Sequence, residues 1–191
     1  RRELRARRAA ITAGQRQRAA TRVAATLAAG VWLRHGRRIA LYISTGSELD
    51  TSALLALARR RGCMLYAPRI SSYRDSRLQM VRCRDGAVRP NRFGIGEPPA
   101  GMPMAARHLD LILLPLLGVD GAGNRIGSGA GYYDRLLAWR AGGTDRAGPL
   151  LVGLAYECQR VDHVPAMAHD VPLDAIVTEA GWHFFHRRLD A

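Results

Sequence analysis

The stretch LDLILLPLLGVDGAGNRIGSGAGYYDR at residues 109–135 decides the fold. Residues 109–117 are almost all apolar, which is typical of a central strand of a parallel sheet that is buried on both faces. A glycine-rich loop follows at 118–131, and a helix is expected from about Tyr132 to Arg140. A buried strand that leads through a loop into a helix is the repeating unit of α/β folds.

The alternation of strands and helices continues before this stretch. The pattern predicts a helix over 1–29, a strand over 37–44, a helix over about 51–61, a strand over 63–68 that Pro68 closes, and a strand over 78–83. Residues 86–103 are rich in glycine and proline and are expected to form an ordered surface loop.

Two more buried strands are expected after it, over 149–156 and 173–179, with a short last strand over 183–185. The sequence therefore predicts an α/β protein, a three-layer α/β/α fold with a mostly parallel central sheet, in a single domain over 1–191. Ligands of such sheets bind at the carboxyl ends of the strands. The loops after residues 44, 117 and 156 are therefore expected on one rim.

The composition narrows the class of protein. The formal net charge is +13, and all 29 basic residues are arginine. A nucleic-acid binder is one interpretation, but the arginines are dispersed and few aromatics lie among them. We expect weak, unspecific nucleic-acid binding that is lost at moderate salt, and no specific nucleic-acid partner. A positive field that attracts an anionic small molecule is the alternative.

Targeting and cysteine patterns favour a cytoplasmic protein. No apolar run approaches the roughly 20 residues of a membrane-spanning helix. The three cysteines, Cys63, Cys83 and Cys158, fit neither a disulfide framework nor a zinc site. Reduced thiols in a reducing compartment are expected.

The glycine-rich loop is the main candidate for binding chemistry. Six glycines lie between Gly118 and Gly131, more than a plain connection needs. Alternating glycines let backbone N–H groups approach a phosphate, although the loop is neither a dinucleotide fingerprint nor a lysine-containing P-loop. Arg125 could neutralise a phosphoryl group, and Asp134 is either a magnesium ligand or a first-turn acid of the helix.

Two acidic clusters are weaker candidates. The segment ISTGSELDT at 43–51 places Glu48 and Asp50 after a strand end, where acids often cap helices. The segment HVPAMAHDVPLD at 163–174 contains His169, Asp170 and Asp174. A zinc site there is disfavoured, because no helical spacing aligns His163 with His169.

Five motifs, in this order, carry a resemblance to a known family. They are R-x-x-L-R (1–5), S-x-x-S-E-L-D-T (44–51), N-R-I-G-S-G-A-G-Y-Y-D-R (124–135), G-L-A-Y-x-x-Q (153–159) and H-D-V-P-L-D (169–174). Together the chain resembles the 5-formyltetrahydrofolate cyclo-ligase family, also called methenyltetrahydrofolate synthetase. The resemblance covers nearly the whole chain and is loosest in the first helix and around 70–105.

The resemblance implies an ATP-dependent, magnesium-dependent ligase that converts 5-formyltetrahydrofolate to 5,10-methenyltetrahydrofolate, with ATP between the N-terminal helix and the glycine loop. Arg125 and Arg5 would be the catalytic residues. The ATP contacts would be Arg1, Arg5, Arg125, Ile126, Gly127, Ser128, Gly129, Ala130, Gly131, Tyr132 and Tyr133. The folate contacts would be Ile43, Glu48, Ser128, Gly129, Ala130, Gly131 and Tyr132. Asp134 and Asp170 would bind magnesium.

The same resemblance implies small-molecule partners, no membrane and a monomer. The position of Arg1 is often a lysine in the family. A sugar-phosphate isomerase or an acyl-CoA transferase on a related sheet is the alternative, because fold alone does not separate these activities. Neither alternative requires ATP and magnesium.

Overall fold

A computed structural model of the chain describes residues 1–84, 88–140, 148–167 and 170–185. Its centre is an eight-stranded sheet in the order β12-β11-β10-β7-β1-β2-β3-β6. The strands are β1 (Arg38–Leu41), β2 (Met64–Ser72), β3 (Arg77–Arg82), β6 (Pro103–Met104), β7 (Leu111–Pro115), β10 (Leu150–Leu154), β11 (Ala175–Thr178) and β12 (Gly181–Phe184). Neighbouring strands from β11 to β2 are parallel, and β12, β3 and β6 are antiparallel edges.

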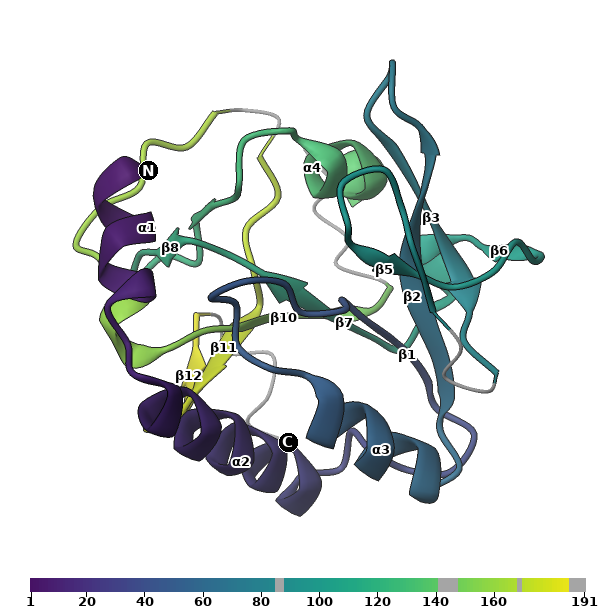
Figure 1. Cartoon of the computed structure of the whole chain (residues 1–191), viewed down its shortest axis with the longest axis horizontal. Helices are drawn as coiled ribbons and strands as arrows, with labels where there is room; N and C mark the ends of the chain where they lie inside the picture. The colour runs from purple at the N-terminus through teal and green to yellow at the C-terminus, as the bar shows by residue number, and fades with distance from the viewer. Residues whose placement is uncertain (85–87, 141–147, 168–169, 186–191) are drawn as a thin grey trace.

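Helices cover both faces of the sheet, which confirms the predicted three-layer fold. Figure 1 shows α2 (Ala13–Ala29) and α3 (Ser52–Arg60) side by side along one face, with α4 (Tyr132–Leu137) on the other. Successive strand residues point to opposite faces, so Leu111 and Leu113 pack in one apolar cluster and Ile112 and Leu114 in the other. Three 3₁₀ turns complete the helical layers: Ala106–His108, Ala138–Arg140 and Glu157–Gln159.

The chain reverses its direction of travel across the sheet between β1 and β7. From β1 it proceeds outward to β2 and β3, and later returns to β7 and continues to β10 and β11. Such a switch point leaves a crevice beyond the carboxyl ends of the two strands, where ligands of α/β sheets bind. The topology thus selects the ends of β1 and β7 as the place for a site.

The prediction of one helix over 1–29 is wrong. The segment forms α1 (Arg2–Ala9) and α2, separated at Ala10–Thr12. Thr12 is the N-cap of the second helix. Its hydroxyl accepts a hydrogen bond from Gln15 N, and Gln15 Oε1 accepts one from Thr12 N at 2.9 Å. This reciprocal capping box starts a new helix in a new direction. As a result α2 packs on the sheet, while α1 lies beside the carboxyl ends of the strands (Figure 1).

Pro68 does not close its strand, as the sequence predicted, because β2 continues to Ser72. Pairing with β1 ends at Tyr66, and beyond it β2 pairs only with β3. The N–H of Ile70 points to Glu97 Oε1 at 3.0 Å, away from β3. Pro68 is two residues earlier and has the same orientation, so its missing N–H breaks no bond to β3.

The predicted surface loop over 86–103 is partly structured, and residues 86 and 87 lie outside the described residues. It contains the β4–β5 hairpin (Arg89–Pro90 and Gly96–Glu97) before the edge strand β6. A second short pair, β8 (Gly118–Val119) and β9 (Arg125–Ile126), lies within the glycine-rich loop. Two-residue strands have no measurable periodicity, so the pattern of apolar residues could not reveal them.

Gly153, in the middle of β10, marks the tightest packing of the sheet. A Cβ added there would lie 2.5 Å from Leu116 Cδ2 and 2.8 Å from Leu173 Cδ1. Gly153→Ala is expected to lower the free energy of unfolding by about 1–3 kcal/mol through overpacking, measured by denaturant titration. In Gly121→Ala the added Cβ meets nothing within 4 Å, so this control should change it by less than about 0.5 kcal/mol. Equal losses in both variants would contradict the packing argument.

Candidate active site

The crevice at the switch point is a cleft of about 510 Å³, called here the rim cleft. Six segments line it: α1, the turn after β1, the extension of β2 with Leu78 of β3, the glycine-rich loop with α4, the β4–β5 hairpin, and a last segment with Val164, Pro165, Met167 and Asp170. Its floor includes Pro115, Leu116 and Leu117 at the end of β7. The sequence prediction of one shared rim is thus confirmed for the loops after residues 44 and 117, and the chain after β10 reaches the cleft at Val164, Pro165, Met167 and Asp170.

All of the predicted site residues line this one cleft, although they come from four distant parts of the chain. They are Arg1, Arg5, Ile43, Glu48, Arg125, Ile126, Gly127, Ser128, Gly129, Ala130, Gly131, Tyr132, Tyr133, Asp134 and Asp170. His169 falls outside the described residues. The individual role of each residue stays a prediction.

The glycine-rich loop lines the rim cleft next to α1. Gly129 and Gly131 have φ values of 116° and 67°, in the left-handed region that side chains disfavour. Gly131 is also the residue from which α4 starts. The guanidinium of Arg5 on α1 donates to the carbonyl of Ser128 at 2.8 Å, so α1 and the loop are in direct contact.

Arg125 follows a turn that is held by the buried carboxylate of Asp120. The carboxylate of Asp120 accepts hydrogen bonds from the N–H groups of Ala122, Asn124 and Val164 at 2.9–3.1 Å. Burial alone would raise the pKa of Asp120, but these bonds, together with that from the Asn124 side chain, hold it below its usual range. The turn connects β8 to β9, and Arg125 is the first residue of β9.

Arg125 and Asp134 form an ion pair, and both residues line the cleft. The Arg125 side chain is only 6% exposed, and it donates both to Asp134 and to the carbonyl of Val171. Burial lowers the pKa of the Arg125 guanidinium, while the negative charges of Asp134 and Asp170 raise it. Two carboxylates therefore flank one buried cation in the cleft.

Glu48 lines the rim cleft from the turn between β1 and α3. Its carboxylate accepts from the N–H of Thr45 at 3.0 Å and is half-buried. Burial raises the pKa of Glu48, and the Thr45 hydrogen bond and the charge of Arg8 only partly oppose this. A buried hydrogen bond holds this turn in place: Tyr42 Oη donates to the carbonyl of Leu49 at 2.9 Å.

Asp50, the other acid that the sequence singled out in this turn, binds the first residue of α3 and does not line the cleft. Its carboxylate accepts from Ser52 N at 3.0 Å and from Ser52 Oγ at 2.7 Å, at the start of α3. Burial alone would raise the pKa of Asp50, but these hydrogen bonds from Ser52 hold it below its usual range.

The wall formed by the β4–β5 hairpin was missed by the sequence analysis. Glu97 Oε1 accepts from Ile70 N at 3.0 Å and from Asn91 Nδ2 at 2.8 Å, which ties the hairpin to β2. Phe93 at its tip is 57% exposed and lines the cleft. Asn91 and Gly94 mark a turn in the sequence, but no short-range signal shows that this turn faces the site.

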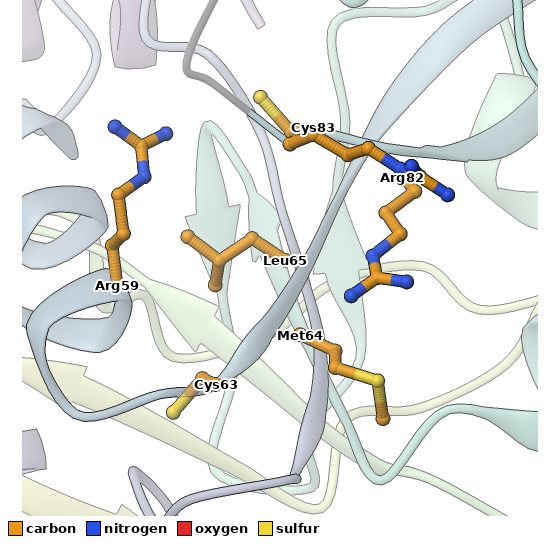
Figure 2. Close-up of a pocket in the computed structure, with 7 residues that line it drawn as sticks. Arg59, Cys63, Met64, Leu65, Arg82 and Cys83 are labelled. Carbon is orange, nitrogen blue, oxygen red and sulfur yellow. The ribbon is translucent and has the colours of Figure 1, made fainter.

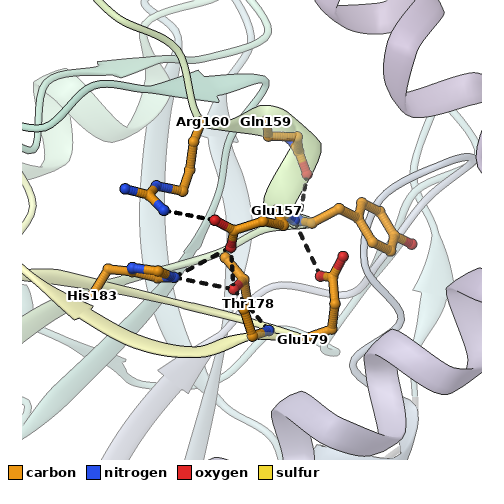
Figure 3. Close-up of polar contacts among 8 residues, drawn as sticks. Glu157, Gln159, Arg160, Thr178, Glu179 and His183 are labelled. Atoms are coloured by element: carbon orange, nitrogen blue, oxygen red, sulfur yellow. Dashed lines mark hydrogen bonds and ion pairs between the residues drawn. The ribbon is translucent and has the colours of Figure 1, made fainter.

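A group of polar side chains around Glu157, called here the Glu157 cluster, lies outside the lining of the cleft. Figure 3 shows Glu157, in the 3₁₀ turn after β10, between Arg160, Thr178 and His183. Its carboxylate accepts from Thr178 Oγ1 and from Arg160, each at 2.6 Å, and lies 3.2 Å from His183 Nε2. Burial alone would raise the pKa of Glu157, but these partners lower it.

The remaining candidates do not form a catalytic site. Asp174 forms a buried ion pair with Arg140, from which its carboxylate accepts two hydrogen bonds at 2.9 and 3.0 Å. A second pocket of about 350 Å³ lies at the opposite end of β2. In Figure 2, Arg59 and Leu65 lie on one side of that strand and Arg82 and Met64 on the other, so the basic groups do not converge. Within the described part of the chain, no three His, Cys, Asp or Glu side chains form a metal cluster.

Comparisons with known proteins agree with this geometry. A family model described as the 5-formyltetrahydrofolate cyclo-ligase family matches residues 1–179. The 5-formyltetrahydrofolate cyclo-ligase of Haemophilus influenzae is 34% identical over 175 residues, which cover 90% of this chain and 91% of that protein. The cyclo-ligase of Escherichia coli K12 is 30% identical, covering 92% and 96%. The solved structure of Aquifex aeolicus 5,10-methenyltetrahydrofolate synthetase has a TM-score of 0.81 at 26% identity, covering 100% and 96%.

Proposed function

Since this chain belongs to the 5-formyltetrahydrofolate cyclo-ligase family, we propose that it converts 5-formyltetrahydrofolate to 5,10-methenyltetrahydrofolate, with cleavage of ATP, in the rim cleft. It is an ATP-dependent ligase of folate metabolism. One observation carries the assignment of the reaction to this place. The same cleft is lined by a glycine loop with arginines and by a half-buried carboxylate, Glu48, from a different segment. We assign the nucleotide to the glycine-loop end and the folate to the Glu48 end.

The glycine-loop end suits a triphosphate. Arg1, Arg5 and Arg125 line it, and the backbone from Gly127 to Gly131 is free of large side chains. Guanidinium groups and backbone N–H groups are the donors that bind phosphate oxygens best. We therefore assign ATP to the space between α1 and the glycine-rich loop, with Ile126, Ser128, Ala130, Tyr132 and Tyr133 completing its surroundings.

The donor set at Asp134 and Asp170 fits magnesium. Magnesium in nucleotide sites is held by one or two carboxylates and by the phosphates themselves, so a larger protein cluster is not needed. Both carboxylates line the cleft beside Arg125. When bound there, the metal would neutralise charge on the phosphate oxygens. Asp134 would be shared between the metal and Arg125, which holds the carboxylate in place.

The Glu48 end suits the pterin of the folate. A carboxylate can accept hydrogen bonds from the amino and ring N–H groups of a pterin, and Ile43, Phe93 and Ile95 add apolar surface to the same cleft. The segment from Ser128 to Tyr132 is assigned to both ligands, as the family resemblance implies. Phe93 adds an aromatic surface that the sequence did not predict.

The reaction proceeds in two steps. The oxygen of the N5-formyl group attacks the γ-phosphorus of ATP and ADP leaves, which gives a formyl carbon bonded through oxygen to phosphate. N10 then attacks this carbon and loses its proton to solvent, and phosphate leaves with the former formyl oxygen as the ring closes. The protein supplies positioning and charge neutralisation, which account for most of the rate in phosphoryl transfer. Arg125 and Arg5 are the cations placed to stabilise the charge on the transferred group.

The test is a direct assay. Purified protein is mixed with 5-formyltetrahydrofolate, ATP and magnesium, and the absorbance of the methenyl product is followed together with the release of ADP. We expect equal amounts of methenyl product and ADP, and none of either when ATP or the folate is omitted. ATP cleavage that depends on a different substrate, or no methenyl product, would overturn the proposal.

Glu48→Gln separates stability from folate binding. Because the pKa of Glu48 is raised above its ordinary value of 4.5, the folded state binds a proton more tightly than the unfolded state. The free energy of unfolding therefore falls as pH rises from 4.5 through the raised value. The variant should lose this dependence and be at least as stable as wild type at neutral pH, while KM for the folate rises by about tenfold or more, as expected for one charged hydrogen bond.

Melting curves between acid and neutral pH, together with separate KM values for both substrates, check this expectation. A variant with weaker ATP use and an unchanged KM for 5-formyltetrahydrofolate would show that the two ligands occupy opposite ends from those proposed.

Location and assembly remain proposals. Within the described residues, no helix is both long and apolar enough to cross a bilayer. Cys63, Cys83 and Cys158 are free thiols, which suits the cytoplasm. We propose a monomer with one domain over residues 1–191, which binds nucleic acid only weakly and without specificity.

A further inference from the structure

Helix α1 contacts the glycine-rich loop and the turn after β1 through two arginines that lie one helical turn apart. Arg5 donates to the carbonyl of Ser128 in the glycine-rich loop at 2.8 Å. Arg8 donates from Nε to Ser47 Oγ at 3.1 Å and from Nη1 to the carbonyl of Leu116 at 3.3 Å. Ser47 precedes Glu48, so the same helix touches the proposed nucleotide end and the proposed folate end.

The partners of Arg8 are also held by residues of the turn after β10. Gln159, which is 2% exposed, donates from Nε2 to the same Leu116 carbonyl at 2.7 Å. Tyr156 donates from Oη to the carbonyl of Glu48 at 3.3 Å. Both residues belong to the turn that the Glu157 cluster fixes (Figure 3). Arg8 therefore binds to a firm surface on the sheet side.

Helix α1 itself is weakly attached. It has eight residues, and only Leu4 is buried, packed against Gly118. A helix of this length has little stability of its own and depends on its tertiary contacts. The break at Ala10–Thr12 also separates it from α2. Its position over the cleft thus depends on Leu4, on the hydrogen bonds of Arg5 and Arg8, and on Arg16 of α2, which donates to the carbonyl of Ala9 at 3.0 Å.

We propose that Arg8 is a positioning residue that couples ATP binding to folate binding by transmitting the placement of α1 to the Ser47–Glu48 turn. The inference rests on the proposed function. ATP bound between Arg5 and the glycine loop would fix α1, and Arg8 would then hold Ser47 in place before the folate arrives. The second ligand meets a turn that is already ordered, so it loses less entropy on binding, and the effect must be reciprocal.

The charge of Arg8 supports the same role. Arg8 lines the cleft near Glu48, and within the described residues it forms no ion pair with a carboxylate. It opposes the rise in the pKa of Glu48 that burial causes. A fixed α1 therefore also favours the ionised form of the carboxylate that is assigned to the folate.

Titration calorimetry on the full chain tests the coupling. The dissociation constant of 5-formyltetrahydrofolate is measured with and without an ATP analogue whose β and γ phosphates are joined by a methylene, in the presence of magnesium, and the converse pair is measured too. We expect wild type to bind each ligand about fivefold tighter or more when the other is present, with equal factors in both directions. In Arg8→Gln the factor should fall to nearly one.

Arg7→Gln is the matched control, because Arg7 is the exposed neighbour that pairs with Glu3 on the same helix. It should keep the wild-type factor. Ser47→Ala removes the hydrogen bond from the other side and should lower the factor as Arg8→Gln does, which keeps the test valid if Arg8→Gln folds poorly. Arg8→Lys, which cannot bind both acceptors with separate nitrogens, should be intermediate.

A wild-type factor of one, or an unchanged factor in both Arg8→Gln and Ser47→Ala at unchanged melting temperature, would overturn the coupling. Neither result would affect the proposed function, which fails only if wild type does not bind 5-formyltetrahydrofolate or does not form the methenyl product.

Discussion

Arg125→Lys is expected to lower turnover by at least about 100-fold, the loss seen when one preorganised donor to a developing charge is removed. The guanidinium of Arg125 is held by Asp134 and by the carbonyl of Val171, and it lines the rim cleft. A planar fork can keep both of these bonds and still direct an N–H group at a phosphate. A lysine ammonium has three donors but only one nitrogen, so it cannot reach the acceptors that Arg125 contacts from two separate nitrogens.

The chain contains a matched control for this experiment. Arg140 is also 6% exposed and also pairs with an aspartate, Asp174, but it does not line the cleft. Arg140→Lys should therefore lower the melting temperature while the turnover of the folded enzyme stays close to wild type. If both variants lost turnover equally, Arg125 would be reduced to a structural residue. Turnover should be normalised to the folded fraction, measured by circular dichroism.

Asp134→Asn should raise the magnesium concentration for half-maximal rate by about tenfold or more, because a carboxylate ligand becomes a neutral amide. It should also lower turnover by a factor similar to that of Arg125→Lys, since the two side chains form one pair. Loss of a charged hydrogen-bond partner for buried Arg125 is expected to reduce the free energy of unfolding by about 1–3 kcal/mol.

The measurement is a magnesium titration of the rate at saturating ATP and folate, for wild type, Asp134→Asn and Asp174→Asn. Asp174→Asn breaks the control pair and should show a lower melting temperature with a wild-type magnesium dependence. An unchanged magnesium dependence in folded Asp134→Asn would remove it from the metal site and leave Asp170 as the candidate ligand.

The sequence predicted the chemistry of the site better than its walls. Strand ends and the glycine-rich loop are local features, so the place of Glu48 and Arg125 on one rim followed from the strand pattern and the rule for parallel sheets. The family resemblance then added Arg5 and assigned Asp134 and Asp170 to magnesium. All of these residues line the same cleft.

What the sequence could not predict depends on contacts between distant residues. Arg8 and Leu116 are 108 positions apart, and Gln159 and Leu116 are 43 apart. No periodicity records such pairs. The break between α1 and α2 was different, because the T-x-x-Q capping box at 12–15 is visible in the sequence. The continuous apolar spacing across it favoured one long helix, and the cap prevailed because the chain must turn to bring α1 to the cleft.

The continuation of β2 past the end of β1 makes one wall of the cleft sensitive to insertions and deletions. Pro68, Ile70 and Leu78 line the cleft from this extension, where β2 pairs only with β3 and Ile70 lies opposite Leu78. Strand side chains alternate, so one inserted residue between Tyr66 and Ile70 would turn the lining residues to the opposite face. A length change in the connection between β2 and β3 would leave that alternation intact. Related chains can therefore be expected to differ in length at this hairpin tip, while the strand before it keeps its residue count.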